Sequence, residues 1–499
     1  MTLTYPVGMK LISPSLLVLG VVLNTLAAFQ LIPAMLAMVL ESGNHGAFFT
    51  SAAVSSVAGT ILAIVGNHYR ASNLQPRQMF LITASAWLVV PCFGALPLVL
   101  HGDGVSFTDA VFESVSGMTT TGSTVFVGLD AMSADVLLWR SLLQWFGGMG
   151  IIGMAIAVLP FLSVGGMKLF RTESSDWSDK SLPRTQQLLK HMVYSYMVLT
   201  LLCALSFWIF GMDWFNAVNH AMTTISTGGY STSDSSFAQF PSLALHWIAI
   251  LFMILGATPF VLYIRFIKHK SVMVFADAQV RGMLMILAAL TVSLTVAAMV
   301  SAATNLGIGN ATGLASALTH AAFNIVSVVT TTGYASTDYM QWGSFAIAIF
   351  FFATFLGGCS GSTSGGIKTF RVQLCFTVIR EQIAKAIHPR AVMTRRYNGS
   401  QVSDDIVTSL VGFLFIMALS LTFMTLVLAM TGLDLLTSLT ASATALMNVG
   451  PGLGDIVGPA GNFSTLSASA KWVLCLGMIM GRLEFLTIIV LLSPAFWRR

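Results

Sequence analysis

The chain has 499 residues, of which 56% are hydrophobic and only 9% are charged. A water-soluble domain carries roughly 25% charged residues, so the composition excludes a soluble globular protein and indicates a polytopic membrane protein. The formal net charge is +5, and the five cysteines show neither the spacing of a metal site nor that of a disulfide framework.

Runs of about 20 apolar residues are long enough to cross a bilayer as helices. The first run lacks a small-residue cleavage site, so we interpret it as a retained helix. The sequence predicts ten spans in five pairs: 10–40 with 46–66, 79–100 with 136–163, 187–211 with 242–267, 280–303 with 342–380, and 406–431 with 469–496.

Positive charge is unevenly distributed between the two sides of these spans. Of the 24 lysines and arginines, all but Arg140, Lys471 and Arg482 fall on one set of connections. By the positive-inside rule, these connections and both termini are predicted to be cytoplasmic. Most acidic residues lie on the opposite face, where they would attract cations.

A short polar stretch recurs four times between apolar segments: "SGMTTTGSTVF" from Ser116, "ISTGGYST" from Ile225, "VTTTGYAST" from Val329 and "MNVGPGLG" from Met447. We take Gly122, Gly229, Gly333 and Gly450 as anchors, separated by 107, 104 and 117 residues. A semi-polar segment too short to span precedes each anchor, and a long apolar segment follows it. This periodicity predicts an all-α membrane protein with four parallel helix–pore-loop–helix repeats in pseudo-fourfold symmetry, as in potassium channels, plus an N-terminal helix pair.

The repeat also predicts how the chain is divided. We expect an N-terminal two-helix extension followed by four pore repeats, the third with a broken second helix. The predicted segments are 1–70, 71–175, 176–270, 271–396 and 397–499.

The polar stretches have the composition of a filter for a monovalent cation. Non-helical backbone at membrane depth is tolerated where it lines a water-filled path or is buried in protein. Backbone carbonyls can then replace the hydration shell of potassium, and glycine permits the required dihedrals. The alternative is a set of Thr/Gly-rich turns that pack helices together. The predicted filter residues, which bind K⁺ through their carbonyls, are Thr120, Thr121, Gly122, Thr227, Gly228, Gly229, Thr331, Thr332, Gly333, Asn448, Val449 and Gly450.

The stretch "GGCSGSTSGGIK" interrupts the long segment after the third anchor. Five glycines and four Ser/Thr within it should break a helix. We interpret it as a gating loop beneath the filter; the alternative is a small-residue packing segment. The predicted gate comprises Gly357, Gly358, Cys359, Ser360, Gly361, Ser362, Thr363, Ser364, Gly365, Gly366, Lys368 and, from the last span, Arg482.

Arg482 is a basic residue well inside an apolar span, which by default marks a functional position. It is predicted either to form a barrier to cations or to donate hydrogen bonds to the broken helix, and the two roles are compatible. Glu484, two residues on, is expected to face elsewhere on the helix. His220 and His320 are predicted to be packing residues.

The four polar stretches, "QWFGGMGIIG", "GGCSGSTSGGIKTFR" and Arg482 together resemble the Trk/Ktr/HKT superfamily of potassium transporters, and within it the bacterial Trk-type (TrkH-like) membrane subunits. The resemblance implies potassium uptake across the bacterial inner membrane, with K⁺ as the transported ion and no organic cofactor. It implies a homodimer surrounded by lipid, and a cytosolic nucleotide-binding RCK-domain subunit of the TrkA type docked on the basic loops 165–190 and 368–396. In this family, glycine at all four anchors accompanies potassium preference. The fourth strand departs from the pattern because it lacks threonine.

The sequence offers two alternatives to a gated channel, an intramembrane protease and an ion-coupled symporter. "GCSG" at 358–361 resembles the motif of rhomboid-type intramembrane serine proteases. Such an enzyme needs a later membrane histidine as base, and the only histidine after Ser360 is His388, in a basic loop. An Na⁺- or H⁺-coupled symporter stays open, although parallel repeats favour a channel over alternating access. No nucleotide-binding or nucleic-acid-binding motif occurs, so nucleotide control would come from another chain.

Overall fold

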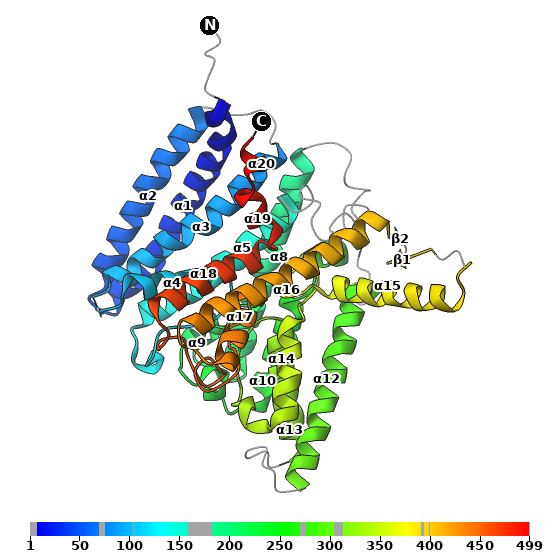
Figure 1. Cartoon of the computed structure of the whole chain (residues 1–499). Helices are drawn as coiled ribbons and strands as arrows, with labels where there is room; N and C mark the ends of the chain where they lie inside the picture. The colour runs from blue at the N-terminus through cyan, green and yellow to red at the C-terminus, as the bar shows by residue number, and fades with distance from the viewer. Residues whose placement is uncertain are drawn as a thin grey trace.

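The computed structural model describes residues 7–68, 75–102, 104–157, 182–269, 276–303, 313–390, 394–398 and 400–498. Within them the chain is almost entirely helical, as predicted (Figure 1). Most of the basic loop 165–190 lies outside the described residues. The beginning of α1 and the end of α20 lie at the same end of the molecule.

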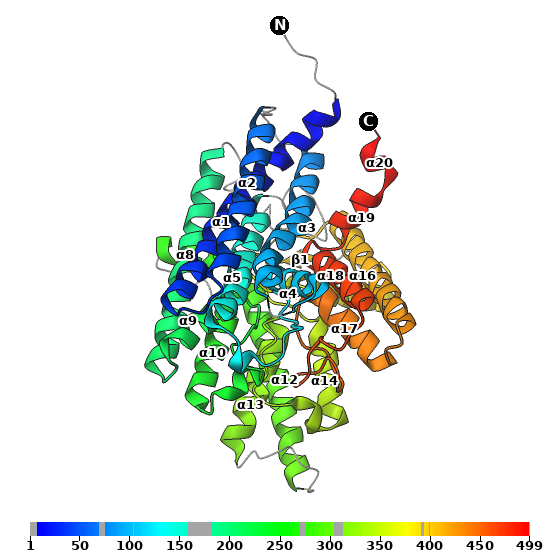
Figure 2. The same ribbon diagram turned by 90° about the vertical axis from the view of Figure 1, so that its left-hand side faces the viewer.

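The N-terminal pair consists of α1 (Val7–Val39) and α2 (His45–His68), which pack along each other and against α3 (Figure 2). A Cβ atom at Gly20, Gly59 or Gly66 would collide with the facing helix. Small residues therefore set the close approach of the two helices, as is common in membranes.

Four similar groups of helices follow. Each has a long first helix, a short helix, an irregular strand and a second helix; single-turn 3₁₀ helices follow the first three strands at η1 (Leu129–Ala131), η3 (Ser236–Gln239) and η5 (Tyr339–Trp342). The α-helices are α3 (Pro76–Leu100), α4 (Phe107–Met118) and α5 (Ala134–Ala157) in the first group; α8 (Leu182–Ile209), α9 (Trp214–Ile225), α10 (Leu243–Gly256) and α11 (Phe260–His269) in the second; α12 (Ala278–Ala303), α13 (Leu314–Val329), α14 (Ser344–Phe355) and α15 (Thr369–Ile387) in the third; and α16 (Asp404–Met430), α17 (Leu435–Met447), α18 (Ala468–Arg482), α19 (Leu486–Leu492) and α20 (Pro494–Trp497) in the fourth.

The short helices α4, α9, α13 and α17 have 12 to 16 residues, fewer than the roughly 20 that cross a bilayer. Three of them begin at a side-chain cap, because Ser106, Asp213 and Asp434 each accept a hydrogen bond from the backbone N–H three residues on. We call these four the half-helices.

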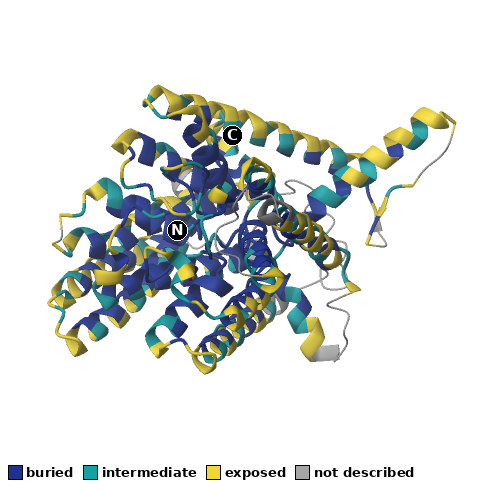
Figure 3. Ribbon diagram, turned by 90° about the horizontal axis from the view of Figure 1, so that it is seen from below, coloured by how far each residue is buried: buried dark blue, intermediate teal, exposed yellow. Residues whose placement is uncertain are grey.

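The groups close into a ring through one repeated contact. The second helix of each group packs against the half-helix of the next: α5 on α9, α10 on α13, α14 on α17, and α18 back on α4. Buried residues gather in the centre of this ring and exposed ones around its periphery (Figure 3). The predicted architecture of four parallel pore-loop repeats with an N-terminal pair is therefore confirmed.

The spans differ in detail from the ten predicted. Six helices of the described chain are long and apolar enough to cross a membrane, and two bent pairs raise that number to eight. The pairs α10–α11 and α18–α19, each predicted as one span, bend by 91° and 111°. The other two predicted spans are not among the eight: α5, whose last described residue is Ala157, contains the buried polar residues Arg140 and Gln144, and 342–380 is interrupted between α14 and α15.

After this interruption α15 extends away from the ring toward a two-stranded hairpin, β1 (Arg396–Tyr397) with β2 (Ser400–Gln401). The Tyr397 hydroxyl donates to Gln373 on α15 at 2.6 Å, and Arg395 pairs with Glu381 on α15 and with Asp404 at the start of α16. Hydrogen bonds from Arg395 and then Lys385 lower the pKa of Glu381 to about 2. The hairpin thus ties α15 to the fourth repeat.

Candidate functional site: a ring of four strands

All four strands after the half-helices have the same backbone hydrogen bonds. Two residues before each anchor glycine, the N–H donates to the carbonyl three residues earlier; one residue before the anchor, the N–H donates to the carbonyl five residues earlier. The pairs are Thr120–Gly117 with Thr121–Ser116, Thr227–Thr224 with Gly228–Thr223, Thr331–Val328 with Thr332–Ser327, and Asn448–Ala445 with Val449–Thr444. The fourth strand therefore has the same backbone fold without threonine.

The backbone dihedrals repeat as well. The residue two before each anchor has a positive φ, between 51° and 58°, at Thr120, Thr227, Thr331 and Asn448. A β-branched residue seldom adopts this conformation, whereas asparagine tolerates it more readily. The anchors themselves have φ between 75° and 110°, and Gly228 does not share this feature, so Gly229 is the equivalent anchor in the second copy. Strain repeated in this way is typical of functional sites.

The four anchors surround one centre. A Cβ atom on each anchor would collide with a carbonyl oxygen of the next strand, and the sequence of collisions returns to its start: Gly122 meets Gly228 O, Gly229 meets Thr332 O, Gly333 meets Val449 O, and Gly450 meets Thr121 O at 2.8 Å. We call these four carbonyls the carbonyl ring. Glycine is required at each anchor both by its φ and by this close approach.

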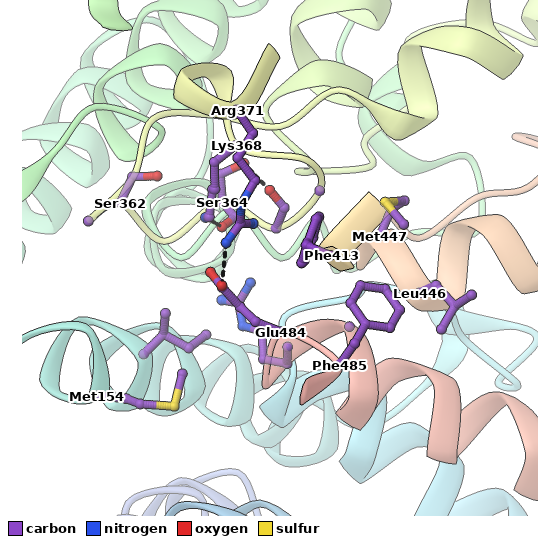
Figure 4. Close-up of a pocket in the computed structure, with 16 residues that line it drawn as sticks. Met154, Ser362, Ser364, Lys368, Arg371, Phe413, Leu446, Met447, Glu484 and Phe485 are labelled. Atoms are coloured by element: carbon purple, nitrogen blue, oxygen red, sulfur yellow. Dashed lines mark hydrogen bonds and ion pairs between the residues drawn. The ribbon is translucent and has the colours of Figure 1, made fainter. Parts of the chain in front are cut away.

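Cavities adjoin the ring on both sides. The segments that follow the anchors line a cavity of about 210 Å³, with Asp234 and Arg140 in its wall. Leu446 and Met447, which precede the fourth anchor, line a second cavity of about 40 Å³ together with the glycine-serine loop (Figure 4). Among the residues that the structure describes, no cluster of three or more His, Cys, Asp or Glu side chains has the arrangement of a metal site.

The glycine-serine loop, Gly357–Lys368, lies directly against the strands. It is irregular, and its neck is closed because Gly357 N–H donates to Ile367 O and Ile367 N–H to Phe355 O, both at 2.9 Å. Its hydrogen bonds to the strands and to the ends of the half-helices are Gly365 N–H to Thr331 Oγ1 at 2.7 Å, Gly366 N–H to Met447 O at 2.9 Å, Thr363 Oγ1 to Ile225 O at 3.0 Å and Thr227 Oγ1 to Thr363 Oγ1 at 3.3 Å. These contacts reach the second, third and fourth repeats.

The loop is also held by charged side chains that line the smaller cavity. Arg482 donates from Nη2 to Thr363 O at 2.7 Å, and Lys368 donates to Ser364 O. Arg371, at the start of α15, forms an ion pair with Glu484. Figure 4 shows Glu484 directed from the opposite wall toward Arg371 and Lys368.

The prediction that Glu484 faces away from Arg482 is wrong. Both residues line the same cavity. The helical spacing argument does not apply, because α18 ends at Arg482 and the chain turns sharply through Glu484 and Phe485, which have φ of 59° and 55°.

The two predicted packing histidines and two asparagines next to the strands form hydrogen bonds. His220 lies within 3.1 Å of Ser231 Oγ, and His320 within 2.9 Å of Ser336 Oγ. Asn324 accepts from Ser336 N–H at 3.0 Å. In the fourth copy, Asn448 donates to Thr121 Oγ1 at 3.0 Å and to Met478 O at 2.8 Å, which joins the fourth strand to the first.

Sequence reasoning missed three buried residues behind the first two strands: Glu113 on α4, and Arg140 and Gln144 on α5. Arg140 pairs with Glu113 at 2.7 Å, and Gln144 donates to Gly228 O at 2.6 Å. One signal was present, since Arg140 is an exception to the charge asymmetry and lies in an otherwise apolar segment. The second exception, Lys471, pairs with Asp109 at 2.6 Å.

The ring of helices, the half-helices and the closed circle of carbonyls define a class: a multi-pass membrane protein with four pore-loop repeats. The family model of TrkH cation transport proteins matches residues 44–499. The chain therefore belongs to the TrkH family and is a transporter rather than an enzyme, so the protease interpretation is set aside.

Individual relatives agree. The chain is 47% identical to the Trk system potassium uptake protein TrkI of Halomonas elongata over 98% of this chain and 97% of that protein. It is 34% identical to the potassium uptake protein TrkH of Escherichia coli over 96% and 98% of the two chains. The crystal structure of the potassium transporter TrkH from Vibrio parahaemolyticus matches with a TM-score of 0.88 at 33% identity, covering 99% of this chain and 100% of that one.

Proposed function

We propose that this protein takes up potassium through the carbonyl ring. The observation that carries the proposal is the closed circle of four backbone carbonyls, each held by the same turn at the C-terminal end of a half-helix. Carbonyl dipoles can replace the hydration shell of K⁺, and the partly negative helix ends favour a cation. Relatives named as potassium uptake proteins support the same ion.

The glycine-serine loop is the proposed gate. It is bonded to three of the four repeats directly beside the ring, and Arg482 and Lys368 add positive charge at that place. A buried positive charge opposes the passage of a cation. Opening would require the loop to leave its hydrogen bonds to Thr331 and Met447.

We further propose that the protein resides in the bacterial inner membrane with both termini in the cytoplasm, as a homodimer regulated by a cytosolic RCK-domain subunit of the TrkA type. Charge asymmetry supports the orientation. The basic residues of α15 and the following hairpin, on the same side, offer a docking surface for such a subunit.

Ion flux in proteoliposomes of the purified protein tests these proposals. We expect K⁺ flux that follows its own electrochemical gradient, in the absence of Na⁺ and of a pH gradient. A strict requirement for Na⁺ or H⁺ would replace the channel by a symporter. Flux that does not distinguish K⁺ from Na⁺ would contradict the filter assignment.

A further inference from the structure

We infer that Gln144 is a specificity-determining residue that positions one member of the carbonyl ring, next to segments that the Glu113–Arg140 ion pair holds in place. The inference rests on the proposed function, since it concerns how the ring keeps its dimensions. Gln144 lies on α5 in the first repeat but acts on the strand of the second. It does not line the path itself; it acts through the backbone of Gly228.

Gln144 holds the second strand on both sides of its anchor. Its Nε2 donates to Gly228 O at 2.6 Å, and its Oε1 accepts from Tyr230 N–H at 3.0 Å. The side chain is fully buried. Both polar ends of the amide are therefore satisfied by main-chain groups that flank Gly229, which fixes the peptide planes there.

This contact explains a departure in the sequence. The residue before the anchor is Thr121, Thr332 or Val449 in three repeats, but Gly228 in the second. A Cβ atom at Gly228 would collide with the carboxamide of Gln144. The first glycine of "STGGY", Gly228, therefore makes room for Gln144.

The ion pair holds the segments beyond the anchors. Arg140 and Glu113 are at most 1% exposed. Glu113 accepts from Val125 N–H at 3.0 Å, and Arg140 donates to Ser231 O at 2.9 Å, so the pair joins the first strand to the second. The guanidinium also lies 4.2 Å from the ring centre of Tyr230, whose hydroxyl donates to Glu113 O at 2.8 Å. Removing either Arg140 or Glu113 would destabilise the protein, because it would leave the other charge buried without a partner.

The arrangement is confined to one quadrant. Arg140 and Gln144 lie on α5, the second helix of the first repeat, whereas the second helices of the other repeats, α10, α14 and α18, contain no glutamine. Within the described chain, Gly228 O is the one carbonyl of the ring that accepts a side-chain hydrogen bond. The backbone geometry of the ring is thus repeated in all four copies, whereas the side-chain hydrogen bond to a ring carbonyl occurs in only one of them within the described chain.

The test compares K⁺-over-Na⁺ selectivity in proteoliposomes for the wild type, Gln144→Leu, Gln144→Asn and Gln144→Glu. Gln144→Leu removes both hydrogen bonds at similar volume, and we expect selectivity to fall about five- to tenfold while K⁺ flux persists. The selectivity of Gln144→Asn should lie between those of the wild type and Gln144→Leu, because the shorter side chain brings its amide less close to the strand. Ser141→Ala is the matched control, because the Ser141 hydroxyl donates within α5 to Leu137 O.

Thermal unfolding and monodispersity of each variant separate positioning from folding. Wild-type selectivity in Gln144→Leu, with lower flux or stability, would overturn the inference and leave a structural role. If Gln144→Leu does not fold, Gln144→Glu decides, since its carboxylate can still accept from Tyr230 N–H but cannot donate to Gly228 O. A wild type that does not select K⁺ would instead overturn the proposed function.

Discussion

At the scale of single residues, backbone conformation dominates the site. Thr120, Thr227 and Thr331 hold a φ that β-branched residues rarely adopt, and the anchors hold one that favours glycine. The threonine side chains do not relieve this strain, so the surrounding hydrogen bonds must impose it. Substitutions at the anchors should therefore change the ring before they change the fold.

Gly122→Ser is expected to weaken K⁺-over-Na⁺ discrimination. Its Cβ would collide with Gly228 O, one of the four ring carbonyls, and a positive φ of 88° adds strain. Competition of Na⁺ against K⁺ or Rb⁺ uptake in proteoliposomes measures the effect. Gly128→Ser is a matched control, because Gly128 also has a positive φ but nothing lies within 4 Å of its added Cβ. Unchanged selectivity in Gly122→Ser would contradict the filter assignment.

Arg482→Ala is expected to raise K⁺ flux. The substitution removes a buried positive charge beside the loop, together with its hydrogen bond to Thr363 O. Initial rates of Rb⁺ uptake, normalised to the amount of folded protein, give the comparison. Arg482→Lys keeps the charge and serves as the control. Loss of folded protein in the alanine variant but not in the lysine variant would point to a purely structural role.

At the scale of elements, the repeat and its broken third copy were predictable from the sequence, whereas the bends in two other helices were not. The polar stretches, their glycine anchors and the break at Gly357–Lys368 follow from composition and spacing, because glycine and short polar segments interrupt apolar helices in a recognisable way. The bends after Gly256 and Arg482 could not be predicted from the sequence, because each lies within a continuous apolar run that is typical of a single span. The contacts of Glu113, Gln144 and Glu484 join distant repeats, and no local pattern specifies them.

The tie between α15 and the hairpin should depend on pH. The pKa of Glu381 is lower in the folded protein than in the unfolded chain, where it is about 4.3. Its contribution to stability is therefore present above that value and is lost as the pH falls toward about 2. Glu381→Gln should lower the melting temperature at pH 7 and pH 5, and the difference from wild type should shrink at pH 3.

Gln382→Ala, at an exposed neighbouring position on α15, is the control for this comparison. It should leave the melting temperature unchanged at all three pH values. A difference between Glu381→Gln and wild type that stayed constant down to pH 3 would show that the carboxylate charge does not matter. In that case the hairpin would be held by Tyr397 and its apolar contacts instead.

At the scale of the whole molecule, the ring has two chemically different faces. One face opens on the larger cavity beside Asp234, and the other is occupied by the loop and its basic side chains. The positive charge on the loop side is the basis of the proposed cytoplasmic orientation of that face.

Thiol labelling in intact cells tests this orientation. Val127→Cys, on the face of the larger cavity, should react with a membrane-impermeant maleimide once the outer membrane is permeabilised; Ile387→Cys, at the end of α15, should react only after the inner membrane is opened. Both variants require a background without Cys92, the exposed native thiol. The reverse pattern would invert the proposed topology.

The four strands share turns, dihedrals and glycine, yet Met447-Asn448-Val449 has replaced the Thr-rich pattern of the other copies. Where the proposed ligand atoms belong to the peptide backbone, most neighbouring side chains can differ without altering those ligands. The copies therefore differ in detail: the first contains Gln144, the third has a broken second helix, and the fourth contains Asn448, which bonds to the first strand. The backbone geometry that the four copies share is thus what permits their side chains to differ.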